Sequence, residues 1–168
     1  MITVTVEERE IIDQIIYKNT LCYVGIIDQD GLPYVIPMNF GYKGDILYLH
    51  SGPDSGSVLA LQKNPNICIT FCEGQELIYQ NEEVACSYRM KSSSVICRGK
   101  VEFEHDFDKK VEALNIIMSQ YTDREFTYST PAVNNVQIWK VKIDSMSSKV
   151  FGMPHRNSKH YKEGETHY

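Results

Sequence analysis

The chain has 168 residues, and a chain of this length normally folds as one domain with a sizeable core. Hydrophobic residues make up 42% and charged residues 23%, which excludes intrinsically disordered, collagen-like and coiled-coil proteins. The net charge of −5 argues against non-specific nucleic-acid binding, which needs a basic surface.

The N-terminal segment predicts a helix. Thr5 and Glu8 fit the S/T-x-x-E capping box, and Asn19 is a plausible stop. Between them, four isoleucines share one helical face: Ile11, Ile12, Ile15 and Ile16.

A run of short strands follows. Residues 21–28 are rich in β-formers and end at Asp30-Gly31, a hairpin signal. Residues 33–42 resume a strand in which Pro37, lacking an N–H group, requires an edge or a bulge. After a turn, residues 46–50 form a third strand, so the pattern is a meander typical of a barrel or sandwich.

The second half of the sequence alternates helical and strand patterns less regularly. The expected elements are a helix over 58–64 ended by Pro65, strands over 66–73 and 92–104 with a bulge or bend at Gly99, a helix over 106–121, a loop over 122–135 and a strand over 136–144. We therefore expect a mainly β fold with inserted helices, of about six antiparallel strands. One domain is expected over 1–150, with a tail over 151–168 that is flexible or packed on a partner subunit.

The cysteines and the N-terminus indicate the compartment. No apolar run approaches the ~18–20 residues of a membrane span, and the acidic start is unlike a signal peptide. A cytoplasmic protein with reduced thiols and no membrane partner is expected. Cys68 and Cys72 lack a second ligand pair, and the tail histidines are spaced by five and seven residues, so no metal site is expected (His155, His160 and His167).

The stretch from His50 to Ser57 carries the most chemistry. A strand delivers His50, and a loop rich in serine and glycine leads into a helix whose free N–H groups suit a phosphate. Helix capping explains the same residues, and Asp54 would repel a phosphate. His50 is either a proton donor near neutral pH or a hydrogen-bonded structural residue.

Two further features have both a functional and a structural interpretation. The first is a basic cluster near three serines: Arg89, Lys91 and Arg98. This cluster either contacts an anion or forms a solvated strand edge protected by charge. Trp139 either stacks on a ligand or belongs to the core. G-x-G-x-x-G and Walker sequences are absent.

Several segments together resemble the pyridoxamine 5′-phosphate oxidase-like flavoproteins, and within them the NimA-type 5-nitroimidazole resistance proteins. The resemblance rests on residues 33–52, 56–71, 87–103 and 138–149, and covers roughly residues 5–150. It implies a split β-barrel homodimer that binds FMN at the dimer interface. The cofactor-binding positions that it implies are Met38, Asn39, Phe40, His50, Ser51, Gly56, Ser57, Arg89, Lys91, Ser94 and Val95.

The sequence departs from the family's pattern in its basic residues. Ser57 replaces the usual lysine, and Ser92-Ser93 replaces a pair that is usually aromatic and basic. The site of a phosphate with nearly two negative charges therefore lacks two basic side chains, and Arg89, Lys91 or Lys63 would have to compensate for them.

The resulting hypothesis is an FMN-dependent oxidoreductase that reduces a small planar acceptor such as a nitroimidazole. His50 is its candidate catalytic residue, as proton donor or positioning group, and Phe40 and Trp139 are candidate apolar walls. The alternatives are a non-catalytic flavin- or haem-binding protein and a pyridoxamine-phosphate-oxidase-like scaffold that has lost its activity. An active pyridoxamine phosphate oxidase is disfavoured, because the C-terminal substrate motif with arginine and histidine is missing.

Overall fold

The computed structural model describes residues 2–153, and these contain eight strands, four α-helices and one 3₁₀ helix. The strands are β1 (Ile2–Val6), β2 (Cys22–Ile27), β3 (Pro33–Met38), β4 (Gly41–Lys43), β5 (Ile46–Ser51), β6 (Asn66–Ile78), β7 (Arg89–Glu104) and β8 (Gln137–Met153). The helices are α1 (Arg9–Tyr17), α2 (Gly56–Lys63), η1 (Ala85–Ser87), α3 (Phe107–Ser119) and α4 (Thr130–Asn134).

The strands form one antiparallel sheet in the order β3-β2-β6-β7-β8-β5-β4, with β1 paired to β8 off this path. The expected mainly β fold with inserted helices is confirmed. The expected count of about six strands is too low. β1 was missed because its pairing partner lies at the far end of the chain, and residues 33–42 divide into β3 and β4 rather than one strand.

The chain divides into two compact units, which share the long strands β6, β7 and β8. Of the described residues, the terminal unit comprises 2–19, 71–96 and 147–153, and the central unit comprises 20–70 and 97–146. The tail expected over 151–168 begins inside β8, which continues to Met153, and its three histidines lie outside the described residues. The boundary at residue 150 stays a prediction.

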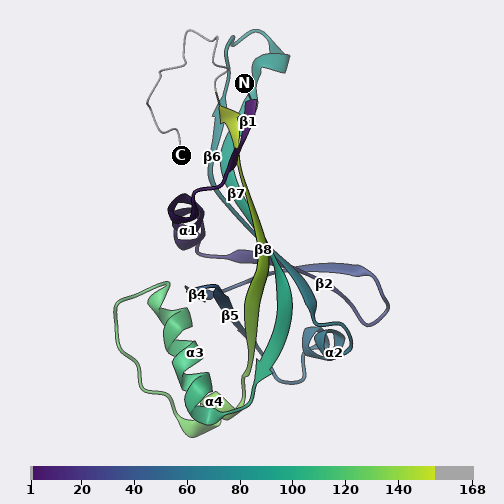
Figure 1. Cartoon of the computed structure of the whole chain (residues 1–168), viewed down its shortest axis with the longest axis vertical. Helices are drawn as coiled ribbons and strands as arrows, with labels where there is room; N and C mark the ends of the chain where they lie inside the picture. The colour runs from purple at the N-terminus through teal and green to yellow at the C-terminus, as the bar shows by residue number, and fades with distance from the viewer. Residues whose placement is uncertain (1, 154–168) are drawn as a thin grey trace. The chain divides into compact units, whose positions relative to one another are not determined.

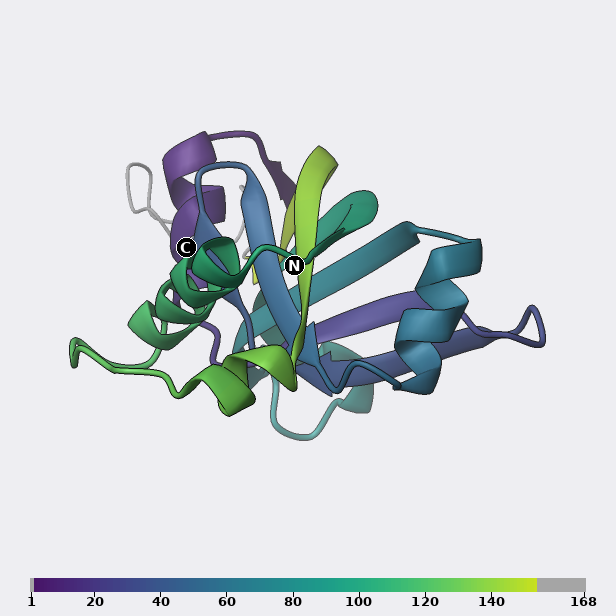
Figure 2. The same ribbon diagram turned by 90° about the horizontal axis from the view of Figure 1, so that it is seen from below.

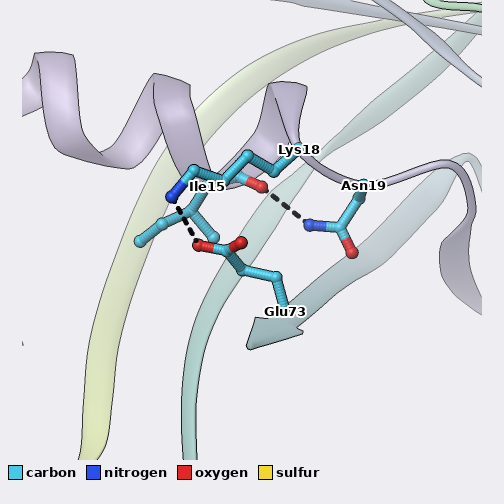
Figure 3. Close-up of polar contacts among 4 residues, drawn as sticks. All are labelled: Ile15, Lys18, Asn19 and Glu73. Carbon is cyan, nitrogen blue, oxygen red and sulfur yellow. Dashed lines mark hydrogen bonds and ion pairs between the residues drawn. The ribbon is translucent and has the colours of Figure 1, made fainter. Parts of the chain in front are cut away.

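The terminal unit contains α1, which differs from the sequence prediction at its start. The capping box is wrong: Thr5 belongs to β1 and pairs with Lys149, and the N-cap is Glu8, with no side-chain cap bond. The buried isoleucine face is confirmed at Ile12, Ile15 and Ile16. The stop is also confirmed, because Asn19 donates its side-chain amide to the Ile15 carbonyl at 2.7 Å, and Lys18 pairs with Glu73 on β6 at 3.3 Å (Figure 3).

The central unit holds most of the large buried side chains. Trp139 is fully buried, meets Phe103 edge-on at a centroid distance of 6.5 Å, and donates its ring N–H to Ser51 Oγ. The core interpretation of Trp139 is therefore confirmed. Two helices flank the strands here: α3 lies beside α4 and against β4 and β5, and α2 lies against β2 (Figures 1 and 2).

Glycines allow two close approaches within the central unit. A Cβ on Gly41 of β4 would lie 2.7 Å from the backbone of Ile116, so α3 packs directly on the strand. A Cβ on Gly99 would overlap the Lys142 carbonyl of the neighbouring β8. A bulge or bend was expected at Gly99, and the structure shows a close backbone contact at this position.

The remaining differences concern element ends. β6, β7 and β8 run well beyond the predicted strands, and the predicted loop over 122–135 contains α4. Among the helices of residues 2–153, none is long and apolar enough to span a membrane.

Candidate functional site

A cavity of about 400 Å³ lies in the central unit, between the β2–β3 hairpin and the N-terminal end of α2. The hairpin contributes Asp28, Gln29 and Asp30 from its turn and Tyr34 from β3. The opposite wall is the start of α2, residues 55–57. The cavity thus has the size of a small-molecule site, with polar walls on both sides.

The hairpin turn is held rigidly by Asp28. Its Oδ1 atom accepts hydrogen bonds from the backbone N–H groups of Asp30 and Leu32, at 2.9 and 2.8 Å. Gly31 completes the turn with a φ of 83°, a value that suits glycine. The predicted Asp-Gly hairpin is confirmed, and it fixes two carboxylates at the cavity wall.

The start of α2 provides hydrogen-bond donors. Ser55 is the N-cap, and its hydroxyl accepts from the N–H of Val58. The N–H groups of Gly56 and Ser57 have no acceptor within residues 2–153, as expected for the first turn of a helix. A Cβ on Gly56 would have only the Gln29 amide within 4 Å, at 3.8 Å, so this position is open.

This donor set fits a phosphate group, whereas the charges around it do not. Among the described residues, no lysine or arginine lines the cavity, while Asp28 and Asp30 do. Asp54 is exposed and leaves the capping role to Ser55. Lys63 is not among the lining residues and lies seven residues along α2 from Gly56, about 10 Å at the rise of a helix.

Ser51 and His50 occupy opposite faces of β5. Ser51 contacts Ser55 at 3.3 Å between hydroxyl oxygens and accepts from Trp139, so its hydroxyl supports the loop before α2. His50 pairs in register with Ile138 and does not line the cavity of Ser55 and Gly56. The two residues are adjacent in sequence, but strand alternation separates their side chains.

His50 is half-buried, and its Nδ1 atom is a buried nitrogen with no hydrogen-bond partner among the described residues. Burial lowers the pKa of its imidazole below the ordinary value of 6.5. The imidazole is therefore neutral at neutral pH, with its unpartnered Nδ1 atom enclosed by the protein. Its register partner Ile138 borders a second cavity, of about 220 Å³, under α3.

The residues expected to meet the flavin ring lie where β3 ends. Met38 is half-buried, with its carbonyl accepting from Cys22 Sγ at 3.4 Å, and Asn39 is exposed. Phe40 is fully buried, so its expectation as an apolar wall is wrong, as is that of Trp139. Tyr121 was not predicted from the sequence. Its hydroxyl accepts from the Phe40 N–H at 2.9 Å and donates to the Thr20 carbonyl at 3.0 Å.

Of the basic residues expected on β7, Arg89 and Lys91 lie in the terminal unit and Arg98 lies in the central unit. Arg89 is exposed and Lys91 is half-buried, whereas Val95 is fully buried. Ser94 is half-buried and points to the opposite face from Val95, as alternation requires. Of these residues, Arg89, Lys91 and Ser94 retain exposed surface for a ligand.

An apolar surface covers the outer face of the β2–β3 hairpin. Tyr23, Ile27 and Val35 are 49%, 38% and 63% exposed. Pro37 stands opposite Tyr23 and Pro33 stands opposite Ile27 in the register, so these side chains share one face. β3 is the last strand of the sheet order on this side, which confirms the edge position expected from Pro37.

The five cysteines are free, with Cys22 and Cys97 buried, Cys68 and Cys72 half-buried and Cys86 exposed. Burial raises the pKa of the Cys22 thiol to about 12. Within residues 2–153, no group of three or more histidine, cysteine, aspartate or glutamate side chains is arranged to hold a metal ion.

Comparisons with known proteins identify relatives along most of the chain. Residues 8–150 match the family model described as pyridoxamine 5′-phosphate oxidase. None of the curated proteins matches the sequence.

Similar folds occur among solved structures. A protein described as a 5-nitroimidazole antibiotic resistance protein from Bacteroides thetaiotaomicron shares 52% identity, with a TM-score of 0.81 over 89% of this chain and 87% of that chain. A flavocytochrome from Azotobacter vinelandii is 23% identical, with a TM-score of 0.77 over 89% of this chain and 70% of its own. An FAD- and haem-binding protein from Mycobacterium smegmatis is 20% identical, with a TM-score of 0.78 over 90% and 75%. The last two similarities concern the fold.

Proposed function

Because the chain belongs to the pyridoxamine 5′-phosphate oxidase family, in the group of the 5-nitroimidazole resistance proteins, we propose that it is a flavin-dependent oxidoreductase. The resemblance of its sequence implies FMN as the flavin. The acceptor that we propose is a small planar molecule of the nitroimidazole kind, in line with the description of the relative at 52% identity.

The observation that carries this proposal is the cavity at the start of α2. Gly56 and Ser57 line a space of about 400 Å³, and their backbone N–H groups, which have no acceptor among the described residues, can donate to a phosphate oxygen. They require no side-chain movement, because the Ser55 cap fixes the first turn of the helix. These residues would hold the phosphate end of a flavin.

When bound, the flavin supplies the electron transfer, and the protein supplies orientation and electrostatics. We assign orientation to the backbone of Met38 and Asn39. The candidate for moving a proton is His50, whose lowered pKa keeps the imidazole neutral near pH 7. We further propose that Arg89, Lys91 and Ser94 contribute to binding the flavin nucleotide.

We propose that the protein is a homodimer. The supporting observation is the apolar face of the hairpin, where Tyr23, Ile27 and Val35 leave large exposed areas on adjacent strands. Contiguous exposed apolar side chains of this kind are typical of protein–protein contact surfaces. A second copy would remove them from water.

The direct test is to purify the protein and identify any released chromophore by chromatography after denaturation. The flavin proposal predicts free flavin in a one-to-one ratio to the chain, or uptake of added flavin by the colourless protein. A single bound cofactor of another kind, with no affinity for flavin, would refute the proposal. Reduction of the bound flavin by NAD(P)H and reoxidation by a nitroimidazole would then test the reductase activity.

A second candidate function is haem binding without catalysis. It depends on His50, whose neutral imidazole would ligate a haem iron through its Nε2 atom, because the unpartnered Nδ1 atom is itself buried. Titration with haemin separates the two candidates: a Soret band that is lost in His50→Ala supports haem ligation, and an unchanged free-haemin spectrum excludes it.

A further inference from the structure

The hydroxyl of Tyr121 joins the two chain segments at the open end of the β2–β3 hairpin. It accepts the N–H of Phe40 at 2.9 Å and donates to the Thr20 carbonyl at 3.0 Å. A tyrosine hydroxyl has one proton and can also accept, so these bonds use both of its capacities. The residue itself is held at the end of α3, where its backbone N–H donates to the Met118 carbonyl at 2.9 Å. Tyr121 therefore ties the open end of the hairpin to α3.

The hydroxyl occupies a place where a direct bond between strands would stand if the hairpin ladder continued. The register pairs Cys22 with Met38, so two places further along, Thr20 stands opposite Phe40. Past this point the chain leaves β2, because β4 pairs with β5. Tyr121 thus fixes the chain where it passes from one neighbouring strand to the other.

Asn39 lies at this passage, and its backbone N–H and carbonyl point outward from the edge of the sheet. Hydrogen-bonded and non-hydrogen-bonded positions alternate along an antiparallel pair, and the Asp28 N–H donates to the Leu32 carbonyl at 2.9 Å. Counting from this pair, even-numbered residues of the hairpin's second strand turn their backbone polar groups towards β2, and odd-numbered residues turn them to the other side. Among residues 2–153, β3 has no strand on that side, and no hydrogen bond occupies the backbone of Asn39.

Prolines leave few donors along this edge. The odd-numbered positions of β3 are Pro33, Val35 and Pro37, and the two prolines carry no N–H group. Val35 and Asn39 are therefore the outward donors, four residues or about 13 Å apart at the rise of a strand. Asn39 is the one that directly precedes the hydroxyl-bound Phe40.

We propose that Tyr121 is a positioning residue for the flavin, because it holds the backbone N–H of Asn39 where this group can donate to the polar edge of the flavin ring. The proposal rests on the flavin binding proposed above, in which Met38 and Asn39 orient the ring, and it names the residue that fixes their geometry. A hydrogen-bond donor at the ring favours the reduced flavin, which carries more electron density, and so raises the reduction potential. Tyr121 acts through the Phe40 N–H and does not itself touch the flavin.

The first test isolates the Asn39 N–H by comparing Asn39→Ala with Asn39→Pro, both loaded with FMN. Alanine removes the side chain and keeps the N–H, whereas proline removes the N–H, as Pro33 and Pro37 do at equivalent positions. The reduction potential is measured by equilibration with a reference dye, and the affinity by quenching of flavin fluorescence. In Asn39→Pro, affinity for reduced flavin should fall about three- to tenfold more than affinity for oxidised flavin, a drop in potential of about 15–30 mV. Asn39→Ala should keep the potential of the unchanged protein.

The second test assigns the position of that N–H to Tyr121. Tyr121→Phe keeps the ring and removes the hydroxyl, and it should lower the potential by a similar amount. In the Asn39→Pro background it should have no further effect, because both changes act on one hydrogen bond. Tyr88→Phe is the matched control, since its hydroxyl donates to the Glu82 carbonyl at 2.9 Å in the terminal unit, and its potential should not change.

The outcomes separate this inference from the flavin proposal. If FMN binds and the potential is unchanged in Tyr121→Phe or in Asn39→Pro, the positioning role is overturned and the flavin proposal stands. An equal drop in Tyr88→Phe, or additive effects in the double variant, would also overturn it, because Tyr121 would then not act through Asn39. Failure of the unchanged protein to bind FMN or FAD would refute the flavin proposal, and this inference with it.

Discussion

The close contact between β4 and α3 makes Gly41→Ala a strong test of the packing. The added Cβ would lie 2.7 Å from three backbone atoms, the C and O of Ile116 and the N of Ile117. Ordinary contact begins at 3.4 Å, so helix and strand must separate by about 0.7 Å. No side-chain rotation relieves the overlap, because all three atoms belong to the helix backbone.

The expected cost follows from the residues that α3 buries. Ala113, Ile116 and Ile117 are each at most 9% exposed, and a shift of the helix loosens all of them. Overpacking typically costs about 1–3 kcal/mol, and a backbone clash belongs at the upper end, about 3 kcal/mol. For a chain of this length the midpoint of thermal unfolding should fall by about 6–12 °C.

The assay is thermal unfolding followed by circular dichroism, with Gly52→Ala as the matched control. A Cβ on Gly52 meets nothing within 4 Å, and its φ is not positive. The control should therefore be neutral or stabilised by up to about 1 kcal/mol, through a less flexible unfolded chain. Equal midpoints for Gly41→Ala and the control would refute the direct packing of α3 on β4.

Three further outcomes are expected. At pH 8, mass spectrometry should detect iodoacetamide modification of exposed Cys86 and none of Cys22, because a pKa of about 12 leaves roughly 10⁻⁴ of the Cys22 thiol ionised. Equal labelling of both cysteines would contradict the burial of Cys22. His50 has a folded-state pKa below its unfolded value of 6.5, so its contribution to stability is complete above about pH 6.5 and is lost as the pH falls towards the folded pKa. Between pH 7 and 5, the midpoint of thermal unfolding should therefore fall less for His50→Gln than for the unchanged protein. The same pH dependence in both proteins would refute this. Tyr121→Phe should lower the free energy of unfolding by about 1–3 kcal/mol in urea, because the N–H of buried Phe40 loses its acceptor; a loss below about 0.5 kcal/mol would show that this bond contributes little.

The sequence predicted the elements that are stabilised by residues close together along the chain. The hairpin at Asp28–Gly31 follows from a turn that needs a carboxylate and a glycine, and both are adjacent in sequence. The start of α2 follows from the serine cap. The candidate phosphate donors at Gly56 and Ser57 were therefore recognisable before the structure.

Signals that depend on distant pairing were missed or misread. Residues 2–6 alternate as a strand does, yet Thr5 and Glu8 also match a helix cap, and only pairing with β8 decides between them. Phe40 is an aromatic residue of the kind that contacts ligands, but it is buried by the strands and by Tyr121, which lies 81 residues away in the sequence. No local pattern contains that information.

Local signals were enough to predict the mainly β class, the β2–β3 hairpin, the capped start of α2 and the family, because each depends on neighbouring residues or on the order of short segments. Which side chains share a cavity became clear only from the folded chain. It joined Asp28, Asp30 and Tyr34 to Gly56 and placed His50 on the other face of its strand from Ser51. The physical reason is that strand pairing and alternation, rather than proximity along the chain, decide where side chains meet.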